Sequence, residues 1–266
     1  MGALTGYAIS IRDEDCGGGS SGPSVPGPDF DHTYVLSEAG DRWGCYGRDD
    51  CGSEIVTGGG GHRVRPARCL AEPNGTAAIA YGGTGVCHQC SNRILYPARK
   101  FVSDARGYAA SVTAYGAYGL DYQVFMTNVV RCRANVDEEL IAQSLSEKEK
   151  YFNDVLSLYS RGEKDIYKVI PEDLELLIRY RCQNRISQSE IIQIKDSHVE
   201  FLKEHHQLIS AMNNEEITRR EFIVKTISKL EERLYLFEKI IGEKEFLVVY
   251  GSPPDRASKI LTVPNA

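Results

Sequence analysis

The chain lacks features that would each point to a particular class of protein. Its 266 residues carry 31 Lys and Arg against 37 Asp and Glu, a formal net charge of −6, so no basic footprint for nucleic acid is expected. No stretch approaches the roughly 18 uninterrupted apolar residues that span a bilayer. The first residues show no basic region followed by an apolar run, so no secretory signal is expected. We therefore expect a protein that is cytoplasmic, or exported without a cleaved signal peptide.

Glycine and lysine are each scarce in one part of the chain. Of the 25 glycines only three lie beyond residue 135, and Lys100 is the only lysine before it. A turn-rich, β-like part is therefore followed by a part built from strong helix formers. We expect one domain over residues 1–134, a helical domain over 135–251 and a loosely held, extended tail over 252–266.

The second part predicts a helical bundle. Apolar residues spaced four and three apart from Ile223 to Ile241 mark one helix face. Thr218 and Glu221 form a capping box at its start, and Gly242 supplies its stop. Two further helices are expected over residues 137–159 and in a shorter stretch that Pro171 opens.

Another helix is expected to begin at Ser187, with Glu190 as the partner in its capping box. His198 and His205 lie on its apolar stripe, about two turns apart. This distance is too great for the adjacent-turn histidine pair of a zinc helix. We therefore expect both histidines to be packed, at least partly, inside the bundle or an interface.

The first part predicts short strands separated by glycine-rich loops. Two of the strands form a hairpin across residues 38–41, and the loops cover residues 17–28 and 58–61. The expected strands are residues 6–12, 30–36, 42–46 and 109–115.

The most informative stretch is residues 81–97, where a glycine turn delivers Cys87 to an expected helix start. Backbone N–H groups and the helix dipole stabilise a thiolate there, and also a developing oxyanion. A cysteine nucleophile also needs a base. His32, held on an expected strand, is the first choice, and His62 in a glycine-rich loop is the second. His88 diverges from its neighbour Cys87 by about 100° around the helix and is a poor base.

This order of motifs resembles the circularly permuted papain-like fold. That group includes permuted NlpC-type cell-wall peptidases, relatives of lecithin-retinol acyltransferase and PPPDE deconjugating peptidases. The resemblance rests on the strand FDHTYV with His32, the strand WGCYG from Trp43 and the helix start GVC with Cys87. It covers about residues 6–118 and implies an α+β fold, an antiparallel sheet with a nucleophile-bearing helix. An all-α bundle, which the resemblance does not cover, follows.

The resemblance implies acyl transfer at an amide, isopeptide, ester or thioester bond. Cys87 would be the nucleophile, His32 the general base and Asp41 a candidate orienting residue. The Cys87 N–H would bind the oxyanion, with Gln89 or Asn92 as a second donor. The substrate would be a peptide, peptidoglycan or an acyl compound, and no cofactor is expected. The helical part leaves three roles open: selecting substrate, capping the site or binding a protein partner.

Other interpretations of the cysteines stay open. Seven of the eight lie in the first half, where thiols, metal ligands or a nucleophile are expected rather than a disulfide framework. Cys87 and Cys90 have the Cys-x-x-Cys spacing of thioredoxin-like redox proteins. A cysteine in this setting is also often only a small, buried apolar residue. A zinc-stabilised binding module without catalysis would draw on Cys45, Cys51, Cys69, Cys90 and His62.

Overall fold

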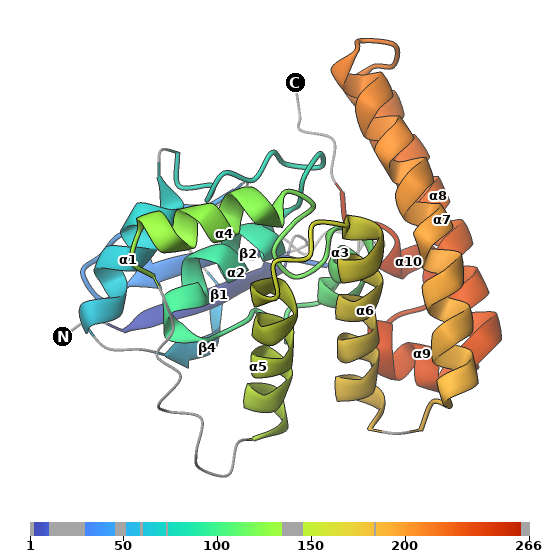
Figure 1. The fold of residues 1–266 in the computed structure, drawn as a ribbon, viewed down its shortest axis with the longest axis horizontal. Coiled ribbons are helices and arrows are strands. Elements are labelled where there is room, and N and C mark those ends of the chain that lie inside the picture. Colours follow the sequence, from blue (N-terminus) through green and yellow to red (C-terminus); the bar gives the residue numbers. More distant parts are fainter. Residues whose placement is uncertain are drawn as a thin grey trace, which may run out of the picture.

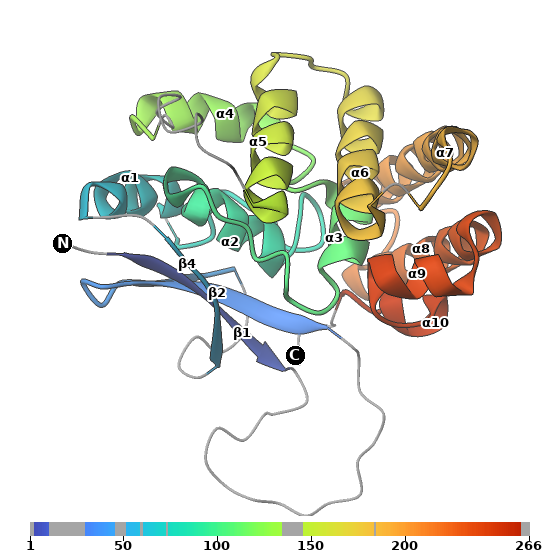
Figure 2. The ribbon, with the colours of Figure 1, turned by 90° about the horizontal axis from the view of Figure 1, so that it is seen from below.

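The computed structural model describes residues 3–10, 30–45, 52–58, 61–72, 74–134, 146–183 and 185–261. Over this part of the chain the fold is α+β, as the sequence predicts, with a small antiparallel sheet and a larger set of helices (Figure 1). Figure 2 shows that the helices gather on one face of the sheet. No helix in the described ranges is long and apolar enough to cross a membrane.

The sheet has four strands in the order β3-β2-β1-β4, and each neighbouring pair is antiparallel. The expected hairpin across residues 38–41 is confirmed, because β2 pairs directly with β3. The strands are β1 (Leu4–Ser10), β2 (Asp31–Ser37), β3 (Arg42–Gly44) and β4 (Ser53–Gly58).

Side chains of β1 and β2 alternate between the two faces of the sheet. Gly6 and its register partner Val35 face the helices, because a Cβ added at Gly6 would meet side chains of the helical layer. Tyr7 and Tyr34, one position along, stack on the opposite face with ring centroids 5.1 Å apart. His32 lies two residues from Tyr34 and therefore shares the face that is turned away from the helices.

The helical layer on the sheet includes α2, whose first residue is Cys87, so the predicted helix start at this cysteine is confirmed. α2 packs against β2 and β3. His62 lies in the first turn of α1, not in the glycine-rich loop where the sequence placed it. The elements of this layer are α1 (Gly61–Ala71), α2 (Cys87–Leu95), the 3-10 turn η1 (Tyr96–Ala98), α3 (Tyr108–Tyr115) and α4 (Tyr122–Arg131).

The expected strand over residues 109–115 is wrong, because these residues form most of α3. Every residue of α3 is buried, so its sequence shows neither the alternation of a half-exposed strand nor the stripe of a surface helix. Gly107 and Gly116 bound the helix with φ angles of 78° and 70°, a left-handed backbone that glycine adopts without strain. A short apolar run between two glycines fits a buried helix as well as a strand.

The second part of the described chain is helical, and three of its predicted helix boundaries are confirmed. Ser187 and Thr218 are N-caps, and Glu190 and Glu221 complete their capping boxes. Gly242 ends the helix that begins after Thr218. The helices are α5 (Glu147–Ser160), α6 (Ile166–Cys182), α7 (Gln188–Asn213), α8 (Arg219–Ile241), α9 (Glu243–Tyr250) and α10 (Pro254–Ala257), and α7 and α8 form a long hairpin (Figure 1).

Two expectations for this part need correction, and a third lies partly outside the described residues. Pro171 does not open a helix but lies inside α6, which Asp165 caps six residues earlier. The tail is not loosely held as far as it is described, because it forms α10 and buries Ile260 and Leu261. Of the helix expected over residues 137–159, α5 covers the end, and residues 137–145 lie outside the described ranges.

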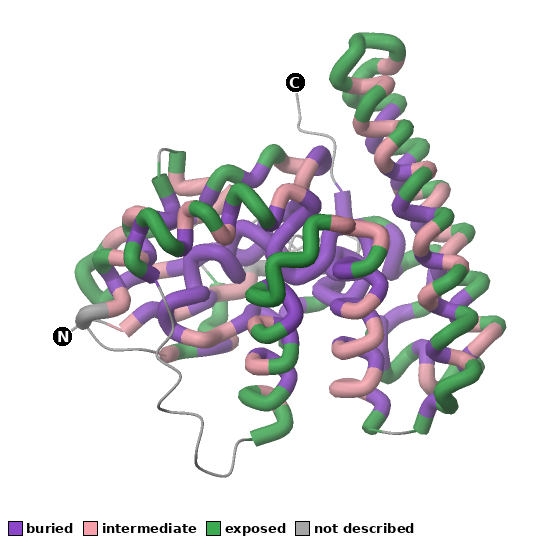
Figure 3. Tube along the Cα trace, in the orientation of Figure 1, coloured by how far each residue is buried: buried purple, intermediate pink, exposed green. Residues whose placement is uncertain are grey.

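α3 lies where the two compositional parts meet, and both parts contribute to one continuous cluster of buried side chains (Figure 3). The Thr113 hydroxyl shares a hydrogen bond of 3.0 Å with the Tyr250 hydroxyl, and the Thr113 carbonyl accepts one of 2.7 Å from His198. The Ala117 N–H, just after α3, donates to the Asp173 carboxylate at 2.6 Å. Contacts on both faces of α3 thus join the helical part to the sheet part.

The expectation that His198 and His205 are packed residues is confirmed, since both are fully buried. The ring of Phe201 lies between them and stacks on each, with centroid distances of 6.0 Å to His198 and 5.7 Å to His205. Burial lowers the pKa of His198 to about 4 and that of His205 to about 3. Both rings are therefore neutral at pH 7.

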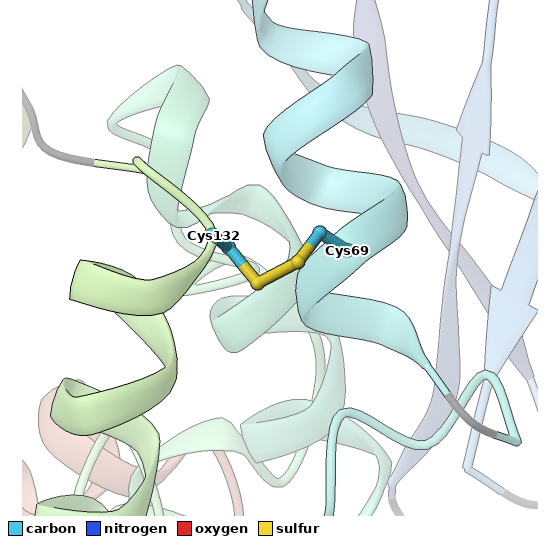
Figure 4. The surroundings of a disulfide bond; sticks show 2 residues. All are labelled: Cys69 and Cys132. Atoms are coloured by element: carbon cyan, nitrogen blue, oxygen red, sulfur yellow. A yellow bond between two sulfur atoms is a disulfide. The ribbon is translucent and has the colours of Figure 1, made fainter.

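A disulfide joins Cys69 of α1 to Cys132, the residue that follows α4 (Figure 4). The expectation of thiols or metal ligands in place of disulfides is therefore wrong for this pair. The bond closes a loop across a sequence separation of 63 residues, so it restricts the unfolded chain strongly. Loop-closure entropy for this length corresponds to about 4 kcal/mol of stabilisation.

Candidate functional site

Cys87 begins α2, and the residues around it shape the helix start. The Gly82 N–H donates to the Gly85 carbonyl at 2.7 Å and closes the glycine turn. Val86 is the N-cap and has no side-chain acceptor, while the Gln89 side chain accepts from the Val86 N–H at 3.0 Å. Among the described residues no side chain caps the Cys87 N–H, which lies at the positive end of the helix dipole.

The first turn of α2 lies against the outer edge of β2. β3 pairs with residues 34–36 of β2 and stops short of Asp31. The Asp31 carbonyl accepts hydrogen bonds from the Cys87 thiol at 3.7 Å and from His88 Nε2 at 3.1 Å. This carbonyl belongs to the peptide unit that joins Asp31 to His32. The thiol therefore lies beside the backbone of the residue predicted to be its base.

His88 is a structural residue of the helix start, which agrees with its rejection as the base. Burial is the main cause that lowers its pKa to about 4, so the ring is neutral at pH 7 and carries one N–H. A carbonyl can only accept, so Nε2 donates to Asp31 and Nδ1 accepts from the Ser111 hydroxyl at 2.9 Å. Both ring nitrogens are thereby engaged, and the imidazole ties α2 to β2 and α3.

His32 lies at the same end of β2 as the Cys87 thiol. It is 6 % exposed, and its ring stacks on Tyr34 with centroids 6.5 Å apart and 20° between the ring planes. A charge on His32 would lower the pKa of His88, so the two imidazoles are within electrostatic reach. The Cys87 thiol lies at the edge of β2 beside Asp31. The side chain of His32, the next residue of the strand, lies on the face of the sheet turned away from α2.

A carboxylate clamp that the sequence did not predict supports this end of β2. Asp31 accepts from the backbone N–H of Arg106 at 2.8 Å and from its guanidinium at 2.9 and 2.7 Å. The Asp31 N–H donates back to the Arg106 carbonyl at 3.1 Å. The clamp holds the loop before α3 against the strand edge and so fixes the carbonyl that receives the thiol. Its partners are 75 residues apart in the chain, and no local pattern reveals them.

Asp41 does not belong to this site. It lies in the turn after β2, where it accepts from Ser37 at 2.8 Å and from Arg68 at 2.6 Å. The hydrogen bond from Arg68 is the main cause that holds its pKa below the ordinary value. Ser37 is five residues from His32 along the strand, about 17 Å at 3.3 Å per residue. Asp41 therefore cannot orient the His32 imidazole.

Gln89 and Asn92 are not available as oxyanion donors, because both amides are fully buried and engaged. The Gln89 Nε2 donates to the Gly116 carbonyl at 2.9 Å. The Asn92 Nδ2 donates to the Ala117 carbonyl at 2.9 Å, and its oxygen accepts from the Val102 N–H at 3.0 Å. These amides fix the segment after α3 to α2. The Cys87 N–H remains the oxyanion donor that the described site offers.

The cysteines are not arranged as a metal site in the described part of the chain, where no group of three or more ligating side chains converges. Cys69 is unavailable because it is in the disulfide. The Cys90 thiol donates to the Gly75 carbonyl at 3.5 Å, and burial and the nearby Cys45 thiol raise its pKa. Cys51 and the side chain of His62 lie outside the described residues.

No protein-family model matches this chain, and no curated protein and no solved structure is significantly similar to it. Its function is therefore argued from the chemistry around Cys87.

Proposed function

We propose that the protein is a cysteine-dependent hydrolase or acyltransferase that acts on an amide, isopeptide, ester or thioester bond. Cys87 is the nucleophile and His32 the general base, and residues 3–134 form a permuted papain-like unit. One observation carries the proposal: the thiol at the start of α2 lies 3.7 Å from the Asp31 carbonyl, directly beside the backbone of His32. The histidine strand precedes the cysteine helix in the chain, as the permuted arrangement requires.

In the proposed reaction, the nucleophile Cys87 and the base His32 act from different sides of the edge of β2. In this proposal the His32 imidazole takes the proton of the Cys87 thiol across the edge of β2 at Asp31. The sulfur attacks the carbonyl carbon, and the oxyanion binds the Cys87 N–H at the helix start. The imidazolium then protonates the leaving group. Water or another acceptor attacks the thioester and releases the acyl group, and the thiol is regenerated.

The fixed surroundings of α2 favour this role over simple packing. The buried His88 and the Asp31–Arg106 clamp hold the helix start and the strand edge together, so the thiol cannot drift along the strand. Pre-organisation of this kind is what a nucleophile on a rigid scaffold needs. The thioredoxin-like alternative is less well supported, because the Cys90 thiol donates to the Gly75 carbonyl and the Cys87 thiol to the Asp31 carbonyl, and not to each other.

An acyl-enzyme experiment tests the proposal. The full chain is mixed with p-nitrophenyl acetate at neutral pH, quenched in acid and mapped by peptide mass spectrometry. We expect one acetyl group on Cys87, formed together with released p-nitrophenolate. The variant His32→Ala should slow acetylation by about 10²–10⁴-fold, the usual range for loss of a general base.

His206→Ala serves as the matched histidine control, because His206 lies on α7 and is only half buried. It should acetylate at the wild-type rate. Acetyl groups spread evenly over several cysteines, or equal rates in wild type and His32→Ala, would remove the basis for the hydrolase.

A further inference from the structure

Two cysteines outside the proposed catalytic pair lie beneath one loop. Cys45 follows β3 directly, and Cys90 lies one turn after the start of α2. After burial, the Cys45 thiol is the next cause that raises the pKa of Cys90, so the two side chains are close enough to interact. The Cys90 thiol also donates to the Gly75 carbonyl at 3.5 Å, and the Cys45 thiol to the Ile79 carbonyl at 3.9 Å. The same short loop therefore covers both sulfurs.

The elements that carry these thiols are held rigidly. β3 is paired with β2 and packs against α2, and Trp43 of β3 is buried. A Cβ added at Gly75 would lie 3.8 Å from the Trp43 ring, so the covering loop rests on the same strand. The pair is thus kept together by the sheet, the helix and the loop. The closeness of Cys45 and Cys90 therefore follows from the packing of these elements.

The two sulfurs differ in accessibility. Cys45 is half buried, whereas Cys90 is fully buried. Burial and the neighbouring Cys45 thiol raise the pKa of Cys90, so Cys90 is less often a thiolate than an exposed cysteine. A small reagent therefore meets Cys45 first, and Cys90 is placed to resolve the product.

We infer that Cys45 and Cys90 form a disulfide-forming pair that is oxidised by small-molecule disulfides through thiol–disulfide exchange. This inference is independent of the hydrolase proposal, because neither residue takes part in it. It also differs from a Cys87–Cys90 redox pair, because the Cys87 thiol donates to Asp31 and not to Cys90.

The exchange has two steps that balance. The Cys45 thiolate attacks one sulfur of the reagent RSSR, and RS⁻ leaves and takes up the proton that Cys45 lost. The Cys90 thiolate then attacks the Cys45 sulfur of the mixed disulfide, and the second RS⁻ leaves and takes up the Cys90 proton. Two protein thiols are oxidised to one disulfide, and one RSSR is reduced to two RSH.

Peptide mapping of the full chain tests the inference. The protein is equilibrated with mixtures of oxidised and reduced glutathione, quenched in acid, alkylated with N-ethylmaleimide and digested without reductant. We expect a Cys45–Cys90 cross-linked peptide to appear as the mixture becomes more oxidising, while Cys69–Cys132 stays intact. In the variant Cys90→Ala the exchange should end at a glutathione adduct on Cys45. The variant Cys87→Ala should form the Cys45–Cys90 disulfide as the wild type does.

Circular dichroism first confirms that each variant is folded, and the disulfide exchange is then measured. Two outcomes overturn the inference. One is that Cys45 and Cys90 both remain alkylated in excess glutathione disulfide. The other is that either cysteine is found linked to a different one, including Cys90 to Cys87.

Discussion

Lowering the pH from 7 to about 4 is expected to unfold the protein, because three buried histidines stay neutral in the folded state at pH values that protonate them in the unfolded chain. Burial lowers the pKa of His88 and His198 to about 4 and that of His205 to about 3, from an ordinary value of 6.5. Below pH 6.5 these histidines bind protons in the unfolded chain but not in the folded chain. The free energy of unfolding therefore decreases as the pH falls. Each histidine contributes about 3 kcal/mol to this loss.

One buried carboxyl, that of Asp173, has the opposite effect on the free energy of unfolding as the pH falls. Asp173 is fully buried, and burial raises its pKa from 3.8 to about 6. The folded state holds this proton more tightly than the unfolded state does, so Asp173 adds stability as the pH falls through that range. Its contribution of about 3 kcal/mol offsets one histidine and leaves the other two. The remaining loss is comparable with the 5–15 kcal/mol that stabilises a typical domain.

His205 offers the sharpest test, because neither of its ring nitrogens has a hydrogen-bond partner among the described residues. It lies among Phe201, Phe222 and Tyr115, so a leucine of similar size suits its surroundings. We expect His205→Leu to raise the urea midpoint at pH 7 and to flatten its decline between pH 6.5 and 4. The neighbouring variant His206→Leu should leave most of that decline unchanged. A decline of equal steepness in His205→Leu would show that this ring does not contribute to acid unfolding.

Replacing Arg93 with methionine is expected to cost about 3–5 kcal/mol of stability, the range for breaking a buried ion pair from one side. Arg93 is fully buried in α2. Its guanidinium donates to the Tyr118 carbonyl at 2.7 Å, to the Ala77 carbonyl at 2.9 Å and to the Asp121 carboxylate. Methionine fills much of the space but leaves both carbonyls without their donor.

Urea unfolding at pH 7 measures this loss, and Arg161→Met is the matched control. Arg161 has a side chain 62 % exposed and pairs with Glu172 on the surface. Its replacement should change the free energy of unfolding by less than about 1 kcal/mol. Equal effects of the two substitutions would mean that the contacts of Arg93 add nothing beyond those of a surface arginine.

The features that the sequence predicted well are those with a local signal. The capping boxes at Ser187 and Thr218 place each acceptor three residues from its partner, so the helix starts could be found without knowing the fold. The hairpin across residues 38–41 and the helix start at Cys87 are local in the same sense.

The features that sequence reasoning missed depend on tertiary contacts. α3 is buried on all sides and carries no periodic pattern, so its sequence predicts a strand as readily as a helix. The Asp31–Arg106 clamp and the Cys69–Cys132 disulfide join residues more than sixty positions apart. The resemblance implies Gln89, two residues after the nucleophile, as one candidate for the second oxyanion donor. The fold directs that amide inward to the Gly116 carbonyl.

The order in which the cysteines react with iodoacetamide tests the central claim most directly. Cys87 is 5 % exposed and Cys45 is half buried, so exposure alone would make Cys45 react first. An activated nucleophile reverses that order. With limiting reagent near neutral pH, we expect the first alkylated peptide to contain Cys87, and His32→Ala to slow its alkylation by about 10²-fold or more. Alkylation of Cys45 before Cys87, at rates that His32→Ala leaves unchanged, would contradict a Cys87–His32 catalytic pair.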